Sequence, residues 1–255
     1  MARLMAHLIA GYPSWETSLE FGRALVAAGA GYLEVQFPFS DGTADGPMIQ
    51  EACHAAIDSG FTLAGGFELV AALTEHTDVP VAVMTYANLV FQNGVAAFVE
   101  RCSEAGAAAI IPPDLPPDYD EGLYATAGRA GIDVVPVVAP TIGEDRLRMI
   151  ASASGAGSGA LMYVSLRKGI TGSYTEIGAD NLRFLEAVRA TGARIAAGFG
   201  VRSSTQVALL DPLVDYVIVG SLLVETLRDA GAAGAAAAAT RAVTDLLGEM
   251  PDGAG

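Results

Sequence analysis

The chain is poor in the residues that build disulfide frameworks and histidine metal sites. Its 255 residues include two cysteines and three histidines. Cys53 and Cys102 both fall in segments with a helical pattern, so we expect two reduced, buried thiols and no disulfide or metal site there. The histidines, His7, His54 and His76, are scattered, and two of them fall on predicted helices. A histidine-based metal site therefore has little support, and we predict no metal and no cofactor.

Basic residues are also scarce. The chain has 14 lysines and arginines against 29 aspartates and glutamates, which gives a net charge of -15 and a pI of about 4.4. So acidic a chain is poorly suited to bind nucleic acid or an anionic membrane surface. The one lysine, Lys168, lies in a predicted loop, whereas a Schiff-base aldolase needs a desolvated lysine on a strand of its active site. Schiff-base chemistry is therefore disfavoured.

Long hydrophobic runs are missing as well. No stretch of eighteen apolar residues occurs, so nothing in the sequence predicts a membrane-spanning helix. The first residues reach a Gly-Tyr-Pro turn at 11–13, too soon for the apolar region and cleavage site of a secretory signal. We therefore expect a cytoplasmic protein.

What the chain does have is apolar residues in a repeating order. They make up 52% of the sequence and charged residues 17%, enough for a large core. Short apolar runs, typical of strands buried on both faces, alternate with segments of helical pattern. The predicted strands are 4–9, 32–37, 79–86, 107–111, 133–138, 160–165, 195–199 and 214–219. The predicted helices are one capped by Ser14, then 48–59, 67–75, 97–105, 119–129, 144–153, 180–190, 205–210, one after Ser221, and 235–247.

Eight strand–helix units in about 250 residues predict an α/β fold, a single (β/α)8 barrel over residues 1–255. An open, doubly wound sheet is the alternative, but no Gly-x-Gly-x-x-Gly turn opens an early helix. In such a barrel the active site lies where the strands end, at their carboxyl ends. That rule directs attention to the residues that finish each strand and to the loops that follow.

The second predicted strand and its loop contain the best candidates for chemistry. Glu34 lies inside an apolar strand, where a carboxylate is costly unless it is paired, hydrogen-bonded or hydrated. Asp41 and Asp45 follow in the loop. One carboxylate on a strand and another on the loop could act as separate acid and base groups on one substrate. The alternative is a buried glutamate bonded to backbone amides, followed by aspartates that cap turns.

Glycine turns end the last two strands, at Gly198-Phe199-Gly200 and Gly220-Ser221. Loops at these positions of a barrel commonly bind phosphate through backbone N–H groups and a helix N-terminus. The alternative is two tight turns without a ligand. The loop that runs from Tyr163 to Gly172 is long and polar, and we expect it to close over a substrate.

Taken together, several motifs resemble the alpha subunit of tryptophan synthase, and they occur in that family's order over nearly the whole chain. They are Pro38-Phe-Ser-Asp, Ala44-Asp-Gly-Pro47, Tyr86-Ala-Asn, Pro113-Asp-Leu-Pro116, Gly169-Ile-Thr-Gly172, Gly198-Phe-Gly200 and Gly220-Ser221. The resemblance implies a barrel that splits indole-3-glycerol phosphate into indole and glyceraldehyde 3-phosphate. It also implies a partner, the pyridoxal-phosphate beta subunit, in an alpha2-beta2 complex.

The resemblance also assigns roles to individual residues. Glu34 matches the glutamate that protonates the indole C3 and helps to deprotonate the glycerol hydroxyl, and Asp45 matches the aspartate that takes up the indole N–H proton. Tyr163 matches a tyrosine near that glutamate, and Thr171 matches a threonine that bonds the aspartate when the loop closes. Tyr86 matches a position that lines the site, and Asp114 matches one that faces the partner. The positions on the phosphate side are matched by Gly172, Gly198, Phe199, Gly200, Gly220 and Ser221.

The chain departs from the family at three positions near these residues. Gln36 replaces the usual glycine and shares a strand face with Glu34, so we expect it to bond Glu34 or to narrow the indole pocket. Gly42 replaces a proline in a loop that adjoins the partner, and His7 stands where an aromatic residue is common. The family's extra N-terminal helix is also missing. These departures leave open a stand-alone indole-releasing lyase, or a regulatory or channelling subunit with little turnover.

Overall fold

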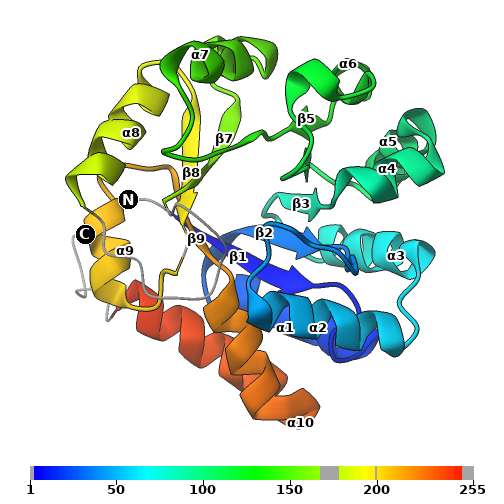
Figure 1. Ribbon diagram of the computed structural model, residues 1–255. Helices are drawn as coiled ribbons and strands as arrows, with labels where there is room; N and C mark the ends of the chain where they lie inside the picture. Colours follow the sequence, from blue (N-terminus) through cyan, green and yellow to red (C-terminus); the bar gives the residue numbers. More distant parts are fainter. Residues whose placement is uncertain (1–2, 167–177, 199, 249–255) are drawn as a thin grey trace.

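Parallel strands from every part of the chain lie side by side around a common centre, with the helices outside them (Figure 1). The computed structural model describes residues 3–166, 178–198 and 200–248. Its strands are β1 (Arg3–Ile9), β2 (Ala30–Gln36), β3 (Val81–Met84), β4 (Ala109–Ile111), β5 (Asp133–Val134), β6 (Val137–Val138), β7 (Leu161–Ser165), β8 (Arg194–Gly198) and β9 (Tyr216–Val219). β1 is the first element of the described chain, and no helix precedes it there.

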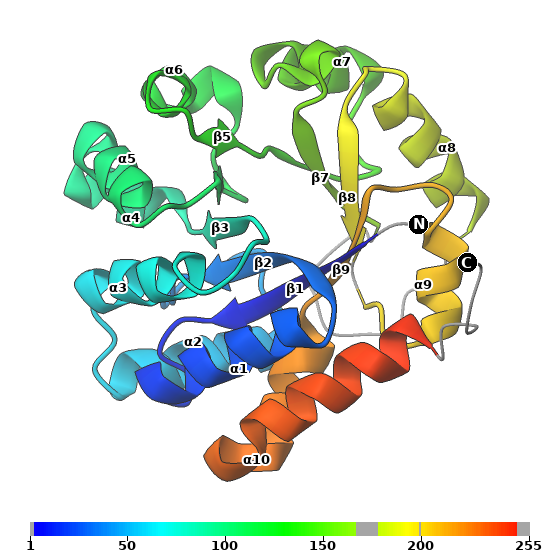
Figure 2. The same ribbon diagram turned by 180° about the vertical axis from the view of Figure 1, so that it is seen from behind.

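The helices follow the strands in alternation, as the repeating pattern predicts. They are α1 (Trp15–Ala27), α2 (Pro47–Asp58), α3 (Leu63–Thr74), α4 (Ala87–Asn93), α5 (Val95–Glu104), α6 (Leu123–Arg129), α7 (Glu144–Ala153), α8 (Ala179–Arg189), α9 (Ser204–Leu210) and α10 (Ser221–Leu247), with short 3-10 turns at Pro117–Tyr119 and Ala156–Ser158. Seen from behind, α10 runs beside α1, so the last helix packs against the first (Figure 2).

A single stretch of chain closes the barrel. The sheet has the order β5-β4-β3-β2-β1-β9-β8-β7-β6, and β5 and β6 are the two halves of the predicted strand 133–138. The Val135 N–H donates to Ile110 O on β4 (2.9 Å), while Pro136 O accepts from the Tyr163 N–H on β7 (3.0 Å). Proline has no N–H to give to a ladder, so the strand changes neighbour at this residue. The ring is therefore complete, and the alternative of an open sheet is wrong.

Residues alternate between the inside of this ring and the layer under the helices. Leu33 and Val35 of β2 belong to the large core between strands and helices, whereas Tyr32 belongs to a smaller cluster inside the ring. Successive side chains of a strand point to opposite faces, so Glu34 and Gln36 share the inner face with Tyr32. The strand pattern thus sends both polar side chains into the barrel, where every residue of β2 is buried.

The boundaries of several elements differ from expectation; α6, for example, begins at Leu123 and not at 119. Tyr86, predicted as the end of the third strand, lies beyond β3 and precedes α4, a helix that the pattern did not reveal. α3 begins at Leu63, before the predicted start, because the Thr62 hydroxyl caps it by accepting from the Gly65 N–H (3.1 Å). The two predicted C-terminal helices are both present in α10, which breaks at Gly231 (φ 62°, ψ 179°).

Two further expectations concern membranes and domains. Within the described residues, no single helix is long and apolar enough to cross a membrane, although the bent pair α2–α3, with 110° between the helices, passes the same length and composition test. One sheet joins strands from Arg3 to Val219. That residues 1–255 form a single domain stays a prediction.

The packing of β8 against β9 generates a stability prediction. A Cβ added to Gly198 would meet the backbone oxygen of Ile218 and would lie 2.7 Å from Ile218 Cβ. The backbone of Ile218 cannot move aside as the end of a flexible side chain can. Gly198→Ala should therefore lower the free energy of unfolding by about 1–3 kcal/mol, the usual cost of overpacking. Urea unfolding followed by circular dichroism measures this.

Gly128 in α6 is the matched control, because nothing lies within 4 Å of a Cβ added there. Gly128→Ala should raise the free energy of unfolding by up to about 1 kcal/mol, since alanine favours a helix over glycine. Equal effects of the two substitutions would contradict the packing argument.

Candidate active site

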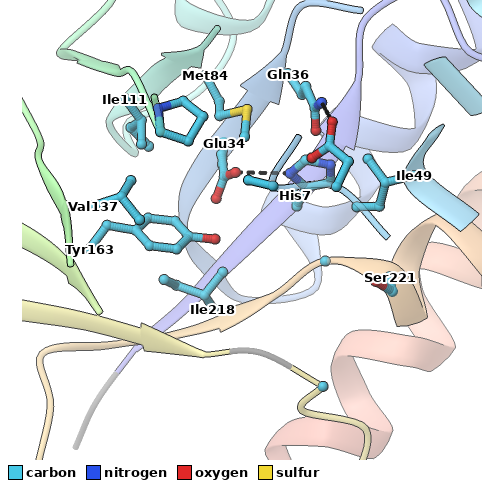
Figure 3. Close-up of a pocket in the computed structure, with 15 residues that line it drawn as sticks. His7, Glu34, Gln36, Ile49, Met84, Ile111, Val137, Tyr163, Ile218 and Ser221 are labelled. Atoms are coloured by element: carbon cyan, nitrogen blue, oxygen red, sulfur yellow. Dashed lines mark hydrogen bonds and ion pairs between the residues drawn. The ribbon is translucent and has the colours of Figure 1, made fainter. Parts of the chain in front are cut away.

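A pocket lies at the carboxyl ends of the strands (Figure 3). Its polar lining comes from His7, Glu34, Gln36, Asp45, Tyr163 and Ser221, and its apolar lining includes Ile49, Met84, Ile111, Val137 and Ile218. Met84 and Ile111 are the last residues of β3 and β4. The pocket therefore occupies the part of a parallel barrel where active sites form.

Glu34 is buried in this pocket and paired with a histidine. Its side chain has 1% of its surface exposed, and Glu34 Oε1 lies 3.0 Å from His7 Nδ1. The two residues are direct neighbours in the β1–β2 ladder, so their side chains emerge side by side on the inner face. A buried carboxylate needs such a partner, because its desolvation is otherwise uncompensated.

Tyr163 approaches Glu34 from the opposite wall, with its hydroxyl toward the carboxylate (Figure 3). Burial raises the pKa of Tyr163 well above its ordinary value, and the Glu34 and Asp45 carboxylates and a hydrogen bond to Glu34 raise it further. The phenol therefore stays neutral at physiological pH and can donate a hydrogen bond. It marks one side of the space around Glu34.

Asp45 is held from two directions. Its side-chain oxygen Oδ2 accepts a hydrogen bond from Gln36 Nε2 (2.7 Å), and its backbone oxygen accepts one from Gln50 Nε2 of α2 (2.9 Å). The Tyr86 hydroxyl accepts from the Ala44 N–H (3.1 Å), which ties the same loop to the start of α4. The loop thus presents Asp45, which is 3% exposed, to the pocket at a fixed position.

Burial raises the pKa of the Asp45 carboxyl above its ordinary value, and the nearby Glu34 carboxylate raises it further. Hydrogen bonds from Gln36 and Tyr86, and the positive charge that His7 can carry, act in the opposite direction. Such a carboxylate is a better proton acceptor than a hydrated aspartate. The environments of the two carboxyl groups also differ, because Asp45 contacts the amide of Gln36 whereas Glu34 contacts the imidazole of His7.

The far side of the pocket is lined by Gly200, Gly220 and Ser221. Ser221 is the first residue of α10, whose free N-terminal N–H groups and positive dipole end face this region. Such a terminus after the last strand of a barrel can hold a phosphate group. The pocket therefore combines two carboxylates with an anion-binding end.

The structure brings together six of the predicted site residues, namely Glu34, Asp45, Tyr163, Gly200, Gly220 and Ser221, in the lining of this pocket. Two others are absent from its described lining: Tyr86 is buried behind the Asp45 loop, and Gly198 packs against β9. Asp114, expected to face a partner, accepts a hydrogen bond from the Ala87 N–H at the start of α4 (2.9 Å). Thr171, Gly172 and Phe199 lie outside the described residues.

The structure gives two pocket residues, Gln36 and His7, contacts that the sequence does not predict. Gln36 is expected to bond Glu34 or to narrow the indole pocket. Its amide donates to Asp45 and not to Glu34, because the loop after β2 folds back over the strand end, and its side chain lines the pocket. His7 had been grouped with the scattered histidines, yet it pairs with Glu34. The available signal was its place in the first strand, on the same inward face as Met5.

The chemistry of the described residues offers no obvious place for a metal ion. No group of three or more His, Cys, Asp and Glu side chains with a suitable arrangement occurs among them. Cys53 and Cys102 are both buried and free, and burial raises the pKa of each thiol to about 12. They therefore remain protonated and are poor nucleophiles at neutral pH.

Comparison with known proteins gives a consistent result. The family model for the tryptophan synthase alpha chain matches residues 1–253. The alpha chain of Helicobacter hepaticus is 40% identical over 234 residues, covering 89% of this chain and 86% of that protein. The alpha chain of Leifsonia xyli is 39% identical over 233 residues, covering 91% and 88%.

Solved structures agree with the sequence comparison. Tryptophan synthase from Mycobacterium tuberculosis superposes with a TM-score of 0.85 at 32% identity, covering 96% of this chain and 92% of that one. A chain from the tryptophan synthase α2β2 complex of Pyrococcus furiosus superposes with a TM-score of 0.87 at 30% identity, covering 96% and 97%. The overall fold of the chain is thus that of known tryptophan synthase structures.

The raised pKa of Asp45 predicts a pH-dependent effect on stability. A carboxyl whose pKa is higher in the folded than in the unfolded chain favours folding below its ordinary value of 3.8, and this contribution is lost as the pH rises through the folded pKa. Asparagine does not ionise, so Asp45→Asn removes the cost of burying a charged carboxylate at pH 7. It also retains an oxygen that can accept the hydrogen bond from Gln36. The variant should therefore be more stable than the unmodified chain at pH 7, and the difference should shrink toward pH 4.

Urea unfolding at a series of pH values measures this difference. Asp41→Asn, on the exposed part of the same loop, controls for the change in net charge. An Asp45→Asn protein that is less stable than the unmodified chain at pH 7 would show that the carboxylate is stabilised, not penalised, by its surroundings.

Proposed function

Since the chain belongs to the tryptophan synthase alpha chain family, we propose that Glu34 and Asp45 carry out that family's reaction inside its barrel. The alpha reaction cleaves indole-3-glycerol phosphate into indole and glyceraldehyde 3-phosphate, so the chain is a carbon–carbon lyase of tryptophan biosynthesis. The observation that carries the residue assignment is one pocket with a buried carboxylate on β2, a second on the following loop, and a helix N-terminus opposite.

The substrate fits this division of the pocket by its chemistry. The indole ring is apolar and flat, which suits the side chains Ile49, Met84, Ile111 and Ile218. The phosphate is a dianion, and it suits the N-terminus of α10 with Gly220 and Ser221. With both ends held, the glycerol carbons and ring positions 1 and 3 would lie between the two carboxyl groups.

The proposed reaction uses each carboxyl group twice. Protonated Glu34 gives its proton to ring carbon 3 while the Asp45 carboxylate removes the ring N–H proton, which produces the indolenine. Glu34, now ionised, takes the proton of the adjacent glycerol hydroxyl. The bond from ring carbon 3 to the glycerol chain then breaks, the hydroxyl carbon becomes the aldehyde, and the bond's electrons return to the ring, which regains its N–H proton from Asp45.

This cycle is balanced, because both carboxyl groups end in the states in which they began. It requires Glu34 to start protonated and Asp45 to start ionised. Two carboxyl groups can hold opposite protonation states only when their surroundings differ. Glu34 lies beside an imidazole and Asp45 beside an amide, so the surroundings of the two groups differ in kind.

The assembly and location belong to the same proposal. Solved relatives include tryptophan synthase complexes with α2β2 composition, and this chain is the alpha subunit of such a complex with a beta subunit. We place it in the cytoplasm, because its two buried thiols require no oxidising compartment. The indole that it releases is the substrate of the beta subunit.

Substitution of the two carboxyl groups tests the catalytic assignment. Glu34→Gln and Asp45→Asn should each lower kcat by about a hundredfold or more, the usual effect of removing a general acid or base. KM should change little, since both variants keep the size and hydrogen-bonding capacity of the pocket. Steady-state indole release measures both constants. Normal kcat in either variant would remove that residue from the mechanism.

A charge at the start of α10 tests the phosphate end. Ser221→Asp should raise KM by about tenfold or more, because like charges a few Å apart repel by more than 1.4 kcal/mol at an effective dielectric constant of about 20. The fold should remain intact, since an aspartate in the first turn of a helix is favourable. The result to compare is KM for indole-3-glycerol phosphate.

Ser204→Asp, at the exposed N-terminus of α9, is the control for an added charge on a helix terminus outside the pocket. It should leave KM unchanged. If Ser221→Asp also leaves KM unchanged, the phosphate binds elsewhere.

A further inference from the structure

Each proposed catalytic carboxyl group contacts a buried polar side chain to which the proposed reaction assigns no role. His7 is 3% exposed and contacts Glu34, and Gln36 is 0% exposed and contacts Asp45. Burial of such groups is costly unless they serve a partner. The two partners come from adjacent strands, β1 and β2, and both line the pocket.

His7 lies directly beside Glu34 in the sheet. His7 and Glu34 occupy matching ladder positions, and their side chains meet at 3.0 Å. On its other side His7 adjoins Gly220, where a Cβ would come within 3.8 Å of the His7 Cβ and Cγ. The imidazole therefore lies between Glu34 and the turn that begins α10.

Gln36 holds Asp45 with different chemistry. Its Nε2 donates to Asp45 Oδ2 (2.7 Å), and Cys53 Sγ lies 3.5 Å from the same nitrogen. An amide cannot ionise, so it donates this hydrogen bond at every pH and favours the ionised form of Asp45. Within the part of the chain that the structure describes, Gln36 Oε1 and His7 Nε2 have no hydrogen-bond partner.

We propose that His7 and Gln36 are positioning residues that hold Glu34 and Asp45, respectively, in their working orientations for proton transfer. The proposal rests on the proposed function, because it assigns the two carboxyl groups to that reaction. Neither residue transfers a proton to the substrate. Each acts by fixing a carboxyl group whose proton must move over a short distance in a set direction.

The positioning role of His7 predicts that removing its hydrogen bond lowers kcat and that an asparagine at this position restores it. His7→Phe removes the hydrogen bond to Glu34 but keeps a buried ring, and kcat should fall by about 10- to 100-fold, the cost of a misplaced catalytic group. KM should stay within a few-fold, because a positioning residue acts on proton transfer and not on substrate binding. His7→Asn can place its amide nitrogen where Nδ1 lies, and it should recover most of kcat.

Lack of rescue by His7→Asn would overturn this half, because it would mean that His7 acts by titrating and not by orienting. An unchanged kcat in His7→Phe would overturn it as well. His76→Asn, on the protein surface, is the matched control and should have no effect. Thermal unfolding of each variant shows whether it folds, and His7→Leu replaces His7→Phe if the latter does not.

The Gln36 half predicts a shift in the pH profile. The ionisable groups around Asp45 are His7 on β1, Glu34 on β2, Cys53 on α2, Tyr86 before α4 and Tyr163 on β7. Gln36→Met keeps the length of the side chain but removes the hydrogen bond that lowers the pKa of Asp45. The ascending limb of kcat against pH should therefore move to higher pH, and kcat should recover on the alkaline side.

A uniform fall in kcat with an unmoved limb would contradict the assignment of Gln36. The failures of the two proposals are distinguishable in this experiment. If the unmodified chain does not cleave indole-3-glycerol phosphate, the proposed function fails. If it cleaves the substrate and the variants behave as the unmodified chain does, only the positioning roles fail.

Discussion

The constraint on which the site depends is the burial of two carboxyl groups inside a parallel barrel. Moving an isolated carboxylate from water into the protein interior carries a large desolvation free energy. Each buried carboxyl group must therefore have a charged or hydrogen-bonding partner, or be protonated. Glu34 has His7 at 3.0 Å, and Asp45 has Gln36 at 2.7 Å. The partners differ in kind, because imidazole can accept or release a proton and an amide cannot. The two carboxyl groups therefore lie in surroundings of different kinds, and the proposed reaction uses one as an acid and the other as a base.

The barrel provides these partners through its register. β1 and β2 run parallel with His7 opposite Glu34, and alternation along β2 places Gln36 on the same inner face. Closure of the ring at Pro136 then brings β7, and with it Tyr163, across from Glu34. The last strand ends at Gly220, and α10 starts at the rim of the same pocket. The two carboxyl groups and the proposed phosphate end thus share one cavity, because the first and last strands of a closed barrel are neighbours.

Most of the fold was predictable from the sequence, because apolar runs buried on both faces stand out against helical segments. The helix at Ala87–Asn93 was missed since it is short and is separated from α5 only by Gly94, whose φ of 78° ends it. Glu34 and Asp45 were predictable as unusual carboxyl groups, and the family resemblance supplied their roles. The partners were not, because a hydrogen bond depends on where a loop returns. Gln36 shares a face with Glu34, yet it bonds Asp45 because Gln50 and Tyr86 hold that loop over the strand end.

The central claim is that this chain cleaves indole-3-glycerol phosphate with its own carboxyl groups and delivers indole to a beta subunit. Indole release by the purified chain, measured with and without a tryptophan synthase beta subunit, tests it most directly. The account predicts slow cleavage by the chain alone and strong acceleration in the complex. Fast cleavage by the chain alone would instead identify a producer of free indole. No cleavage in either condition, together with faster use of supplied indole by the beta subunit, would contradict the account and identify a regulatory subunit.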